Sequence, residues 1–470
     1  MYEKILSSFF TSFFYVVLLS ACSTVAPYKN EKTITSIDIN KGYRPKTSIK
    51  KGDDNNNLIV LMFSGGGSRA AALGYGVLEE LSNTYITVNS QKKSIADNID
   101  IVFGVSGGSI LAAYFSLHGS ETVPNFDKNF LQRDFQNQLI DKFLSIGNWP
   151  KLMSDQYGRG DLLQEELNNT LFHHATFHDL EYNRKGPYAI ISATDMSIGQ
   201  KILFTQTFFD MLCIDLGETE IARAVASSSS VPLIFAPITY NNNAGNCGFS
   251  FENLMNSKLS NKTLNTSSQK SKNLNDAREI LNLYQDSKAR PYIHLVDGGL
   301  TDNLGLSTLL DLYDISSYET MYERAKSEGV KNIIIINVNA QNKIQSNIDS
   351  TANIPNSIDA INTIINVPID IHSANSIKRF RQFVDEWKEF SKDKEDKIEF
   401  KFVSIALKDL KDKTLRDEVL NISTSFFIPK KDVLKLKRAA TILLENSDEY
   451  KDVIKLLKAT KEYKYISDYN

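Results

Sequence analysis

Histidine and cysteine are scarce in this sequence, and the shortage narrows the chemistry that its 470 residues can perform. The chain has six histidines, none of them inside a glycine-rich motif, and three cysteines. A net charge of −3 and the lack of a dense Lys/Arg stripe argue against a nucleic-acid partner. With 42% hydrophobic and 23% charged residues, the composition is that of a globular protein with a sizeable core.

The first 21 residues predict a signal peptide outside the folded protein. Lys4 precedes an apolar stretch, Ile5 to Ala21, whose 17 residues are few for a bilayer span of about 20. Leu19-Ser20-Ala21-Cys22 resembles a bacterial lipobox, in which the cysteine is lipidated and the chain is cut before it. This resemblance implies a lipid anchor on Cys22 and a membrane surface as partner. Because Ser23 rather than aspartate follows, we expect a cell-envelope protein at the outer membrane or periplasmic face; the alternative is an uncleaved anchor.

The rest of the chain divides by composition into three parts. Residues 22–57 are polar, have no sustained apolar period and predict a flexible tether. A catalytic domain is expected over residues 58–340, with a surface insertion at 253–290 that is rich in Asn, Ser and Lys. Residues 341–470 predict a mostly helical extension.

Apolar runs that are typical of buried strands alternate with helical patterns. Helical spacing occurs at 68–82, 109–117 and 430–462. The predicted strands are 58–63, 99–103, 188–194, 201–205, 292–296 and 332–338. Since such strands are apolar on both faces, they predict an α/β fold with a mainly parallel sheet and helices on each side.

Three glycine-rich segments each follow a predicted strand and together supply the parts of an acyl-transfer site. Ser64-Gly65-Gly66-Gly67-Ser68-Arg69 can present backbone N–H groups to an oxyanion. Gly104-x-Ser106-x-Gly108 is the pattern of a nucleophile elbow, a sharp strand-to-helix turn that exposes a serine. Asp297-Gly298-Gly299 places a carboxylate at a strand end, where burial would raise its pKa and improve it as a base.

The first segment also has a competing interpretation. A phosphate-binding P-loop needs a lysine, and Gly67-Ser68-Arg69-Ala70 has none. Two roles stay open for Arg69, which either braces the loop through a structural salt bridge or faces a substrate phosphate.

The order of these motifs resembles the patatin-like phospholipase family. Residues 224–232, followed by Phe235 and Pro237, are similar to the family's Ala-Ser-x-x-x-Pro segment, and the likeness covers roughly residues 58–310. It implies a three-layer α/β fold and a hydrolase of lipid acyl esters, of phospholipase A or lysophospholipase type. The implied substrate is a phospholipid or another acyl-ester lipid, with no metal or cofactor.

The same resemblance assigns roles to five residues. Ser106 would be the nucleophile, Asp297 the base of a Ser–Asp dyad, and Gly65, Gly66 and Gly67 the oxyanion hole. Ala70 replaces the family's glycine and could narrow the loop.

Two alternatives to the dyad enzyme remain. A Ser–Asp–His esterase of the α/β-hydrolase type would use His372, the only histidine after Asp297, although it lies in no glycine-rich or strand-end context. A non-catalytic, membrane-tethered binding module on the same fold is the second.

The remaining metal-ligand residue types offer little further chemistry. His173, His174 and His178 have a spacing that disfavours a metal-binding helix face. Cys213 and Cys247 either form a disulfide, worth about 3–4 kcal/mol in an exported protein, or remain buried thiols.

Overall fold

A mainly parallel sheet forms the centre of the computed structural model, which describes residues 31–45, 56–250, 268–341 and 356–462 together with Ala352 and Ile354. The strand order is β10-β9-β1-β4-β5-β8-β7, with β6 beside β5. The strands from β10 to β5 run parallel, whereas β6, β8 and β7 are antiparallel to their neighbours. Their bounds are β1 Asn57–Phe63, β4 Ile101–Val105, β5 Tyr188–Asp195, β6 Gln200–Leu203, β7 Ile238–Asn241, β8 Tyr292–Val296, β9 Asn332–Asn339 and β10 Glu399–Ala406.

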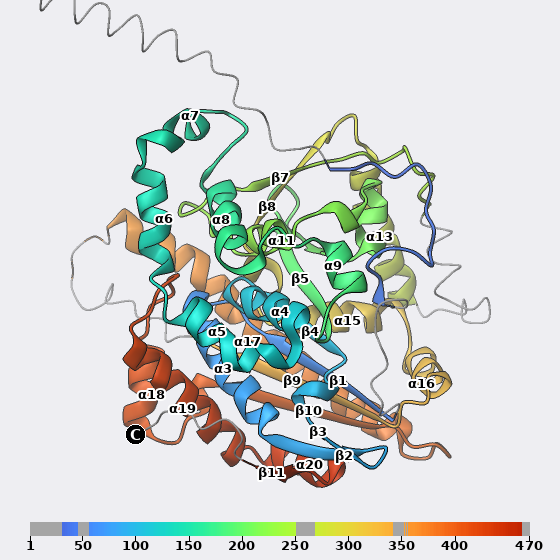
Figure 1. Cartoon of the computed structure of the whole chain (residues 1–470). Helices are drawn as coiled ribbons and strands as arrows, with labels where there is room; N and C mark the ends of the chain where they lie inside the picture. Colours follow the sequence, from blue (N-terminus) through green and yellow to red (C-terminus); the bar gives the residue numbers. More distant parts are fainter. Residues whose placement is uncertain are drawn as a thin grey trace, which may run out of the picture.

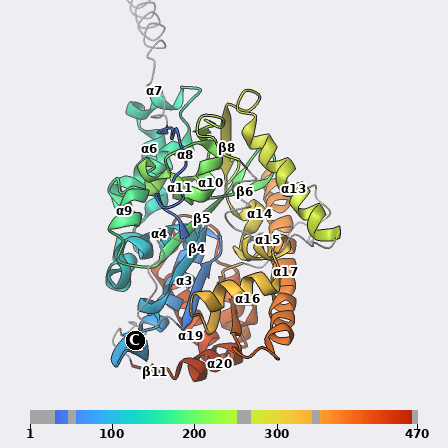
Figure 2. The same cartoon turned by 90° about the vertical axis from the view of Figure 1, so that its right-hand side faces the viewer.

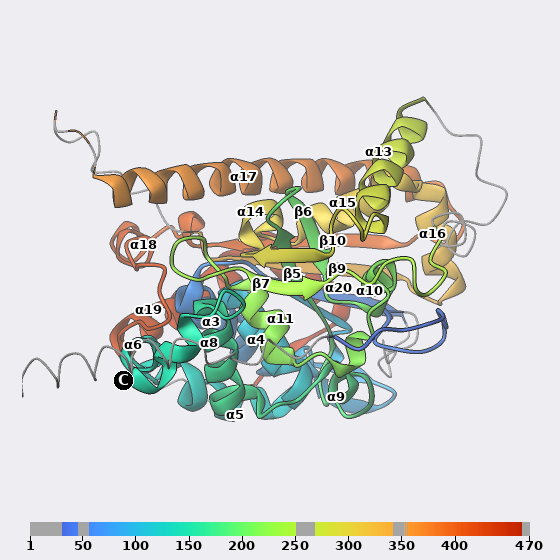
Figure 3. The same cartoon turned by 90° about the horizontal axis from the view of Figure 1, so that it is seen from above.

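Helices cover both faces of this sheet and complete a three-layer α/β fold (Figure 3). One face carries α3 (Gly67–Ser82), α4 (Gly107–His118), α11 (Ile221–Ser228) and α19 (Lys430–Asn446). The other carries α14 (Gly299–Asp302), α15 (Leu306–Ile315), α16 (Tyr318–Ser327) and α17 (Ser357–Ser391). The outer helices include α5 Thr122–Phe126, α6 Phe135–Leu144, α7 Trp149–Leu152, α8 Arg159–Leu167, α9 Phe177–Tyr182, α10 Gln206–Phe209, α13 Ser268–Gln285, α18 Lys413–Leu420 and α20 Asp448–Leu457 (Figure 1).

The side chains of β1 show why its apolar run forms a central strand. Ile59, Leu61 and Phe63 are buried in the larger core, under α3 and α4. Val60 and Met62 point to the opposite face and are buried in the second core, under α15 and α17. Because successive strand residues face opposite sides of a sheet, only a run without polar residues can be buried in both layers.

The elements predicted from periodicity are confirmed with small shifts at their ends. The runs at 58–63, 188–194, 292–296 and 332–338 are β1, β5, β8 and β9. The helices predicted at 68–82 and 109–117 are α3 and α4. A small separate sheet, β2 (Thr84–Val88), β3 (Gln91–Ser94) and β11 (Thr460–Lys461), has no counterpart in the sequence prediction.

The described residues of the segment predicted as an extension, 341–470, include the helices α17 to α20, but the segment is not an appendage. Its residues 399–406 form β10, which pairs in parallel with β9 and completes one edge of the central sheet. Phe400 and Phe402 enter the second core, while Val403 and Ile405 enter the first. The strand was missed because Glu399 and Lys401 interrupt its apolar run at the exposed edge.

Part of the predicted tether 22–57 also packs on the domain. Tyr43 is fully buried and stacks on Tyr188, with ring centroids 4.3 Å apart. Arg44 forms a buried ion pair with Asp210 at 2.6 Å. Glu31 is also buried, and three buried side chains at positions 31, 43 and 44 form no periodic pattern, so residues 31–45 had the polar, aperiodic sequence of a tether.

The insertion predicted at 253–290 contains helix α13, in which Tyr284 is buried; residues 253–267 lie outside the described part.

Cys213 and Cys247 form a disulfide, which decides between the two alternatives left by the sequence. The predicted signal peptide 1–21 and Cys22 also lie outside the described residues. Within the described ranges, every helix is too short or too polar to cross a bilayer.

Candidate active site

The three glycine-rich segments meet at one end of the central sheet, where the parallel strands have their carboxyl ends. Ser64 follows the end of β1 and Ser106 follows the end of the neighbouring parallel strand β4. Asp297 follows β8, which runs antiparallel to β5. Because β8 pairs only with the last residues of β5, Thr194 and Asp195, its carboxyl end lies at the same end of the sheet. Sheet topology thus brings together residues that are about 190 positions apart in the sequence.

Ser106 sits in a sharp turn between β4 and α4. Its backbone has φ 49° and ψ −127°, a region that side-chain-bearing residues seldom adopt. Such strain at a strand-to-helix turn is characteristic of a nucleophile elbow. The Ser106 N–H donates to Ser228 Oγ at 2.8 Å, and Ser228 in turn donates to the Ser192 carbonyl at 2.6 Å. The elbow is therefore held by the last residue of α11 and by β5.

Glycine is required where the first two loops touch. A Cβ on Gly107 would lie 2.1 Å from the Gly67 carbonyl oxygen, and one on Gly108 would lie 2.5 Å from that of Ser64. A Cβ on Gly65 would approach Ser106 Cβ to 3.3 Å. Only residues without side chains allow the predicted oxyanion loop to lie directly against the candidate nucleophile.

Asp297 lies beside Ser106 and is buried. The Ser106 hydroxyl lies close enough to its carboxylate to lower the pKa of that group, and the Gly299 N–H donates a hydrogen bond to it at 2.7 Å. Burial raises the pKa of Asp297 from 3.8 to about 6, although both of these contacts lower it. A carboxylate with this pKa is ionised at neutral pH and is a stronger base than an exposed aspartate.

The serine-rich segment 224–232 positions both candidate residues. Besides holding Ser106 through Ser228, it accepts the Asp297 N–H at the Ser230 carbonyl, at 2.9 Å, and the Gly298 N–H at the Ser228 carbonyl, at 3.1 Å. The Thr194 hydroxyl donates to the Asp297 carbonyl at 2.8 Å. The fourth motif of the sequence therefore holds the backbone at both Ser106 and Asp297.

The three glycines of the predicted oxyanion loop differ in their hydrogen bonding. The Gly65 N–H is already bonded to Asn303, at 3.1 Å from its side-chain oxygen and 3.2 Å from its carbonyl. Gly66 and Gly67, with φ 133° and 59°, lead into helix α3. Their N–H groups donate no hydrogen bond to any residue in the described ranges. A helix N-terminus with unsatisfied donors is a suitable place for a developing negative charge.

Arg69 braces the loop from behind. Its Nε donates to the Ala340 carbonyl at 2.8 Å and its Nη1 to the Ile422 carbonyl at 2.7 Å. Burial lowers the pKa of the guanidinium to about 10, and the charge of nearby Asp370 partly offsets this. Of the two roles left open by the sequence, these contacts favour bracing of the loop. Arg69 does this through hydrogen bonds to two backbone carbonyls and through its attraction to the charge of Asp370.

The polar residues after the third motif support the site without joining the Ser106–Asp297 pair. Asp302 is fully buried and accepts the N–H groups of Ser307 and Thr308 at the start of α15. Asn303, as described above, holds Gly65. Both residues therefore support the turn that follows Asp297 and the loop at Gly65.

All six histidines lie in described parts of the chain, and no hydrogen bond joins any of them to Ser106 or Asp297. His372 is exposed on α17, next to the buried Ser373, whose hydroxyl is 3.5 Å from Asn303 Nδ2. Within the described ranges, no group of three or more His, Cys, Asp or Glu side chains could hold a metal ion.

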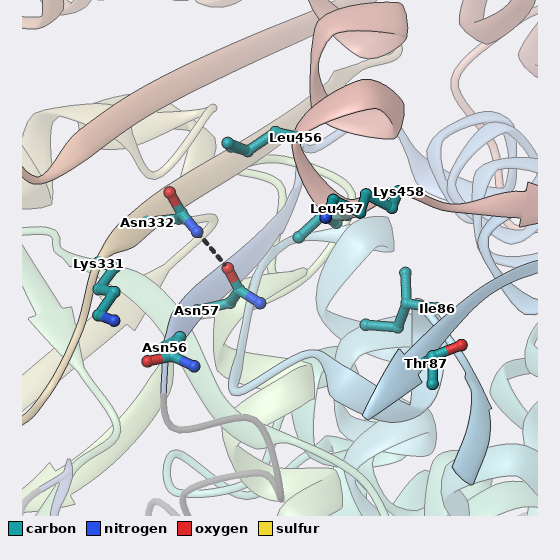
Figure 4. Close-up of a pocket in the computed structure, with 9 residues that line it drawn as sticks. All are labelled: Asn56, Asn57, Ile86, Thr87, Lys331, Asn332, Leu456, Leu457 and Lys458. Carbon is teal, nitrogen blue, oxygen red and sulfur yellow. Dashed lines mark hydrogen bonds between the residues drawn. The ribbon is translucent and has the colours of Figure 1, made fainter. Parts of the chain in front are cut away.

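A surface cavity of about 250 Å³ lies elsewhere in the fold (Figure 4). Asn57 and Asn332 line it and share a 2.8 Å hydrogen bond at the amino ends of β1 and β9. The seven residues of β1 separate it from the glycine loop by about 20 Å, so it is not the site of the candidate chemistry.

Several residues that build the site carry no signal in the sequence. Ser192 and Thr194 resemble any polar residue in a strand. Ser425 accepts the Ser68 N–H at 2.7 Å but lies beyond the segment that carries the motifs. The only signal that could have found Ser228 was its place in the serine run, which gives no indication of which serine makes the contact.

The sequence model described as Patatin-like phospholipase matches residues 61–310 of this chain, just over half its length. Among solved structures, the chain is similar to human GIVD cytosolic phospholipase A2, with 11% identity and a TM-score of 0.30, over 60% of this chain and 46% of that one. It is also similar to VipD from Legionella pneumophila, with 12% identity and a TM-score of 0.28, over 94% of this chain and 72% of that one. This chain thus spans less than half of the human protein. None of the curated protein sequences matches it.

Proposed function

The chain belongs to the patatin-like phospholipase family, whose members are lipid acyl hydrolases, and we propose that it cleaves acyl esters of phospholipids or related lipids with a Ser–Asp dyad. The observation that carries the proposal is the closeness of Ser106 to the buried Asp297, with the glycine loop packed against Ser106; the Gly66 and Gly67 N–H groups of this loop donate to no residue in the described ranges. An alcohol, a base and an oxyanion site are the three parts that acyl transfer needs.

The reaction we propose has two stages. Asp297 takes the proton of Ser106 while Oγ attacks the ester carbonyl carbon, and the oxyanion forms against the Gly66 and Gly67 N–H groups. The tetrahedral intermediate expels the alcohol, which takes the proton from Asp297 and leaves an acyl group on Ser106. Water, deprotonated by Asp297, then attacks the acyl carbon, and Ser106 regains the proton as the fatty acid leaves.

Gly65 has a supporting part in this proposal. Since Asn303 holds its N–H, it contributes to the oxyanion hole by allowing the loop to approach Ser106 rather than by donating a bond in the free enzyme. Asn303→Ala removes the side-chain acceptor of the Gly65 N–H and leaves the main-chain one, so a changed kcat would show that the side chain of Asn303 positions the loop.

Ser106→Ala tests the proposal directly. The wild type should hydrolyse a short p-nitrophenyl ester and at least one of a set of defined phospholipids, with a triglyceride as comparison. Ser106→Ala should lose activity by about 10³-fold or more and lose labelling by a fluorophosphonate, while its circular dichroism and unfolding midpoint stay unchanged. His372→Ala is the control and should keep full activity. Loss of activity in His372→Ala would favour a Ser–Asp–His triad, and a folded wild type that neither hydrolyses nor labels would favour a binding module.

We also propose that Cys22 carries a lipid anchor at the cell envelope. The support is the lipobox-like sequence Leu19-Ser20-Ala21-Cys22 and the fit between a tethered enzyme and a membrane substrate. Mass spectrometry of the mature amino terminus should find an acylated Cys22; an unmodified Met1 would contradict the anchor.

A further inference from the structure

Large apolar side chains are exposed mainly in one place, the segment 135–153, which we call the α6–α7 arm. Of the 17 large hydrophobic residues exposed among the described residues, six lie between positions 140 and 153: Ile140, Phe143, Leu144, Ile146, Trp149 and Met153. Met153 and Ile146 are 78% and 75% exposed. Single exposed apolar residues need no explanation, but such a concentration marks a surface that binds something apolar.

The arm projects from the body of the protein. Figures 1 and 2 show α6 leading outward to α7, which lies at the outer end of the molecule in both views. The amino-terminal residue of α6, Phe135, is buried, whereas most residues from 140 to 150 are exposed. The apolar side chains of the arm are therefore packed against the fold at its base and are mostly exposed beyond it.

Charges on the outer part of the arm, beyond the exposed Asp141, suit a lipid surface. Between Phe143 and Ser154 the only charged residue is Lys151. Lys151 and Lys142 pair with Glu165 and Glu166 of α8, which neutralises the nearest carboxylates. A short apolar segment with a tryptophan and a lysine, and without acidic residues, has the composition of segments that enter the boundary between headgroups and acyl chains.

Two routes of contact join the arm to the candidate site. Six residues after the arm, Arg159 at the start of α8 donates to the Leu233 carbonyl at 2.7 Å, in the loop that follows the serine-rich segment. Leu233 and Ile234 are themselves exposed apolar residues. At the base, Phe135 packs on Phe426, which also packs edge-to-face on Phe235 of this loop.

We propose that the α6–α7 arm, with Leu233 and Ile234, docks on the lipid bilayer that holds the substrate and inserts the side chains of Leu144, Ile146, Trp149 and Met153. This inference rests on the proposed function, since a lipid hydrolase must reach esters that lie at a bilayer surface. The continuity of the arm with the loops around Ser106 and Asp297 selects the bilayer over a protein partner. The arm then acts separately from any anchor on Cys22, because it orients the site rather than tethering the chain.

The chain contains a built-in probe for this docking. It has two tryptophans, Trp149 on the arm and Trp387, which is fully buried in the second core and donates to the Ile398 carbonyl. In the inactive Ser106→Ala background, vesicles of phosphatidylcholine and phosphatidylglycerol with brominated acyl chains should quench Trp149 and shift its emission to the blue. Trp149→Phe should remove this response, because Trp387 cannot reach the lipid.

A second measurement separates docking from tethering. With Cys22→Ser, so that no lipid at this position contributes, the triple variant Leu144→Ser/Ile146→Ser/Met153→Ser should partition to vesicles about 100-fold more weakly. The matched control Met196→Ser/Leu312→Ser, also exposed but outside the arm, should partition like its parent. Activity on a soluble p-nitrophenyl ester should stay unchanged in both.

Three outcomes would overturn the docking proposal: no bromolipid quenching of Trp149, equal partitioning of the triple variant and its control, or a concentration-dependent dimer that the triple variant abolishes. The proposed function fails separately, through a wild type that does not hydrolyse the soluble ester.

Discussion

The glycine-rich loops and the carboxy-terminal segment 399–446 meet at the same site but contribute to it in opposite ways. The loops hold the features that cost stability, namely the left-handed backbone of Ser106 and the buried carboxylate of Asp297. The segment holds features that stabilise, including β10 at the sheet edge and the Ile422 carbonyl that accepts from Arg69. The residues proposed for catalysis and the residues that support them therefore come from different parts of the chain. Only the residues proposed for catalysis lie in sequence motifs.

The largest expected effect distinguishes two aspartates of the same turn. Asp297→Asn should lower kcat by about 10³-fold, because the amide cannot take the Ser106 proton. Asp302→Asn should keep most activity, because Asp302 is outside the Ser106–Asp297 pair; its amide oxygen can still accept one of the two N–H groups that start α15, and the loss of the other should lower stability rather than kcat. Steady-state kinetics on a p-nitrophenyl ester measures both. Equal losses of kcat in the two variants would show that the turn matters only for folding. The proposed role of Asp297 as the base would then be wrong.

The next effect tests where the loop and the carboxy-terminal segment touch. Gly67 has φ 59°, and a Cβ there would lie 2.4 Å from the Ser425 carbonyl oxygen. Gly67→Ala should lower kcat by about 10²-fold, because the displaced loop no longer directs its N–H groups at the oxyanion.

Gly199→Ala is the matched control for this contact. Its φ is 64°, but a Cβ there would meet nothing within 4 Å. It should cost about 1 kcal/mol of unfolding free energy and leave kcat unchanged. If both alanines had the same effect on kcat, the contact with Ser425 would have no part in positioning the loop.

The comparison also explains what could be predicted from sequence. Continuous apolar runs predict buried parallel strands such as β1 and β9, and the glycine motifs predict the turns that follow such strands. The pairing of Ser106 with Asp297 follows from the motif order through the family resemblance. The structure supplied the antiparallel approach of β8, which local pattern does not encode.

The contacts that support the glycine loops could not be predicted, because they use backbone and side-chain groups that occur throughout the sequence. Backbone carbonyls such as those of Ala340, Ile422 and Ser425 exist at every position, so no residue type marks them. Strand β10 sits at an edge and mixes charged with apolar residues, so its pattern is weak. The roles of Asn303 and Ser228 depend on side-chain contacts over long sequence separations.

Arg69→Met tests the stabilising half of the comparison. It leaves the buried carbonyls of Ala340 and Ile422 without a donor, so the free energy of unfolding should fall by about 3–4 kcal/mol. Arg381→Met is the control, because Arg381 is half exposed and pairs with Glu449 at the surface; it should cost under about 1 kcal/mol. Urea unfolding measures both. A raised KM for phospholipid alone, with stability unchanged, would instead place a substrate phosphate at Arg69.

The smallest effect concerns the stability that Asp297 gives up for its chemistry. Its pKa is about 6 in the folded protein and near 3.8 when exposed, so the folded chain binds this proton more tightly. Stability linked to Asp297 is therefore fully present below pH about 4 and is lost as pH rises through about 6. Two pKa units correspond to at most about 3 kcal/mol.

Asp297→Asn removes this titration and should be more stable than the wild type at pH 8, with the difference vanishing near pH 4. Over the same range, kcat/KM of the wild type should rise with pH through about 6 as the base ionises, in the opposite direction to stability. Urea midpoints and rate profiles between pH 4 and 8 measure the two trends. A pH-independent stability difference between the two proteins would mean that Asp297 gains enough from Ser106 and Gly299 to offset its burial, and the loops would then not be the destabilised half of the site.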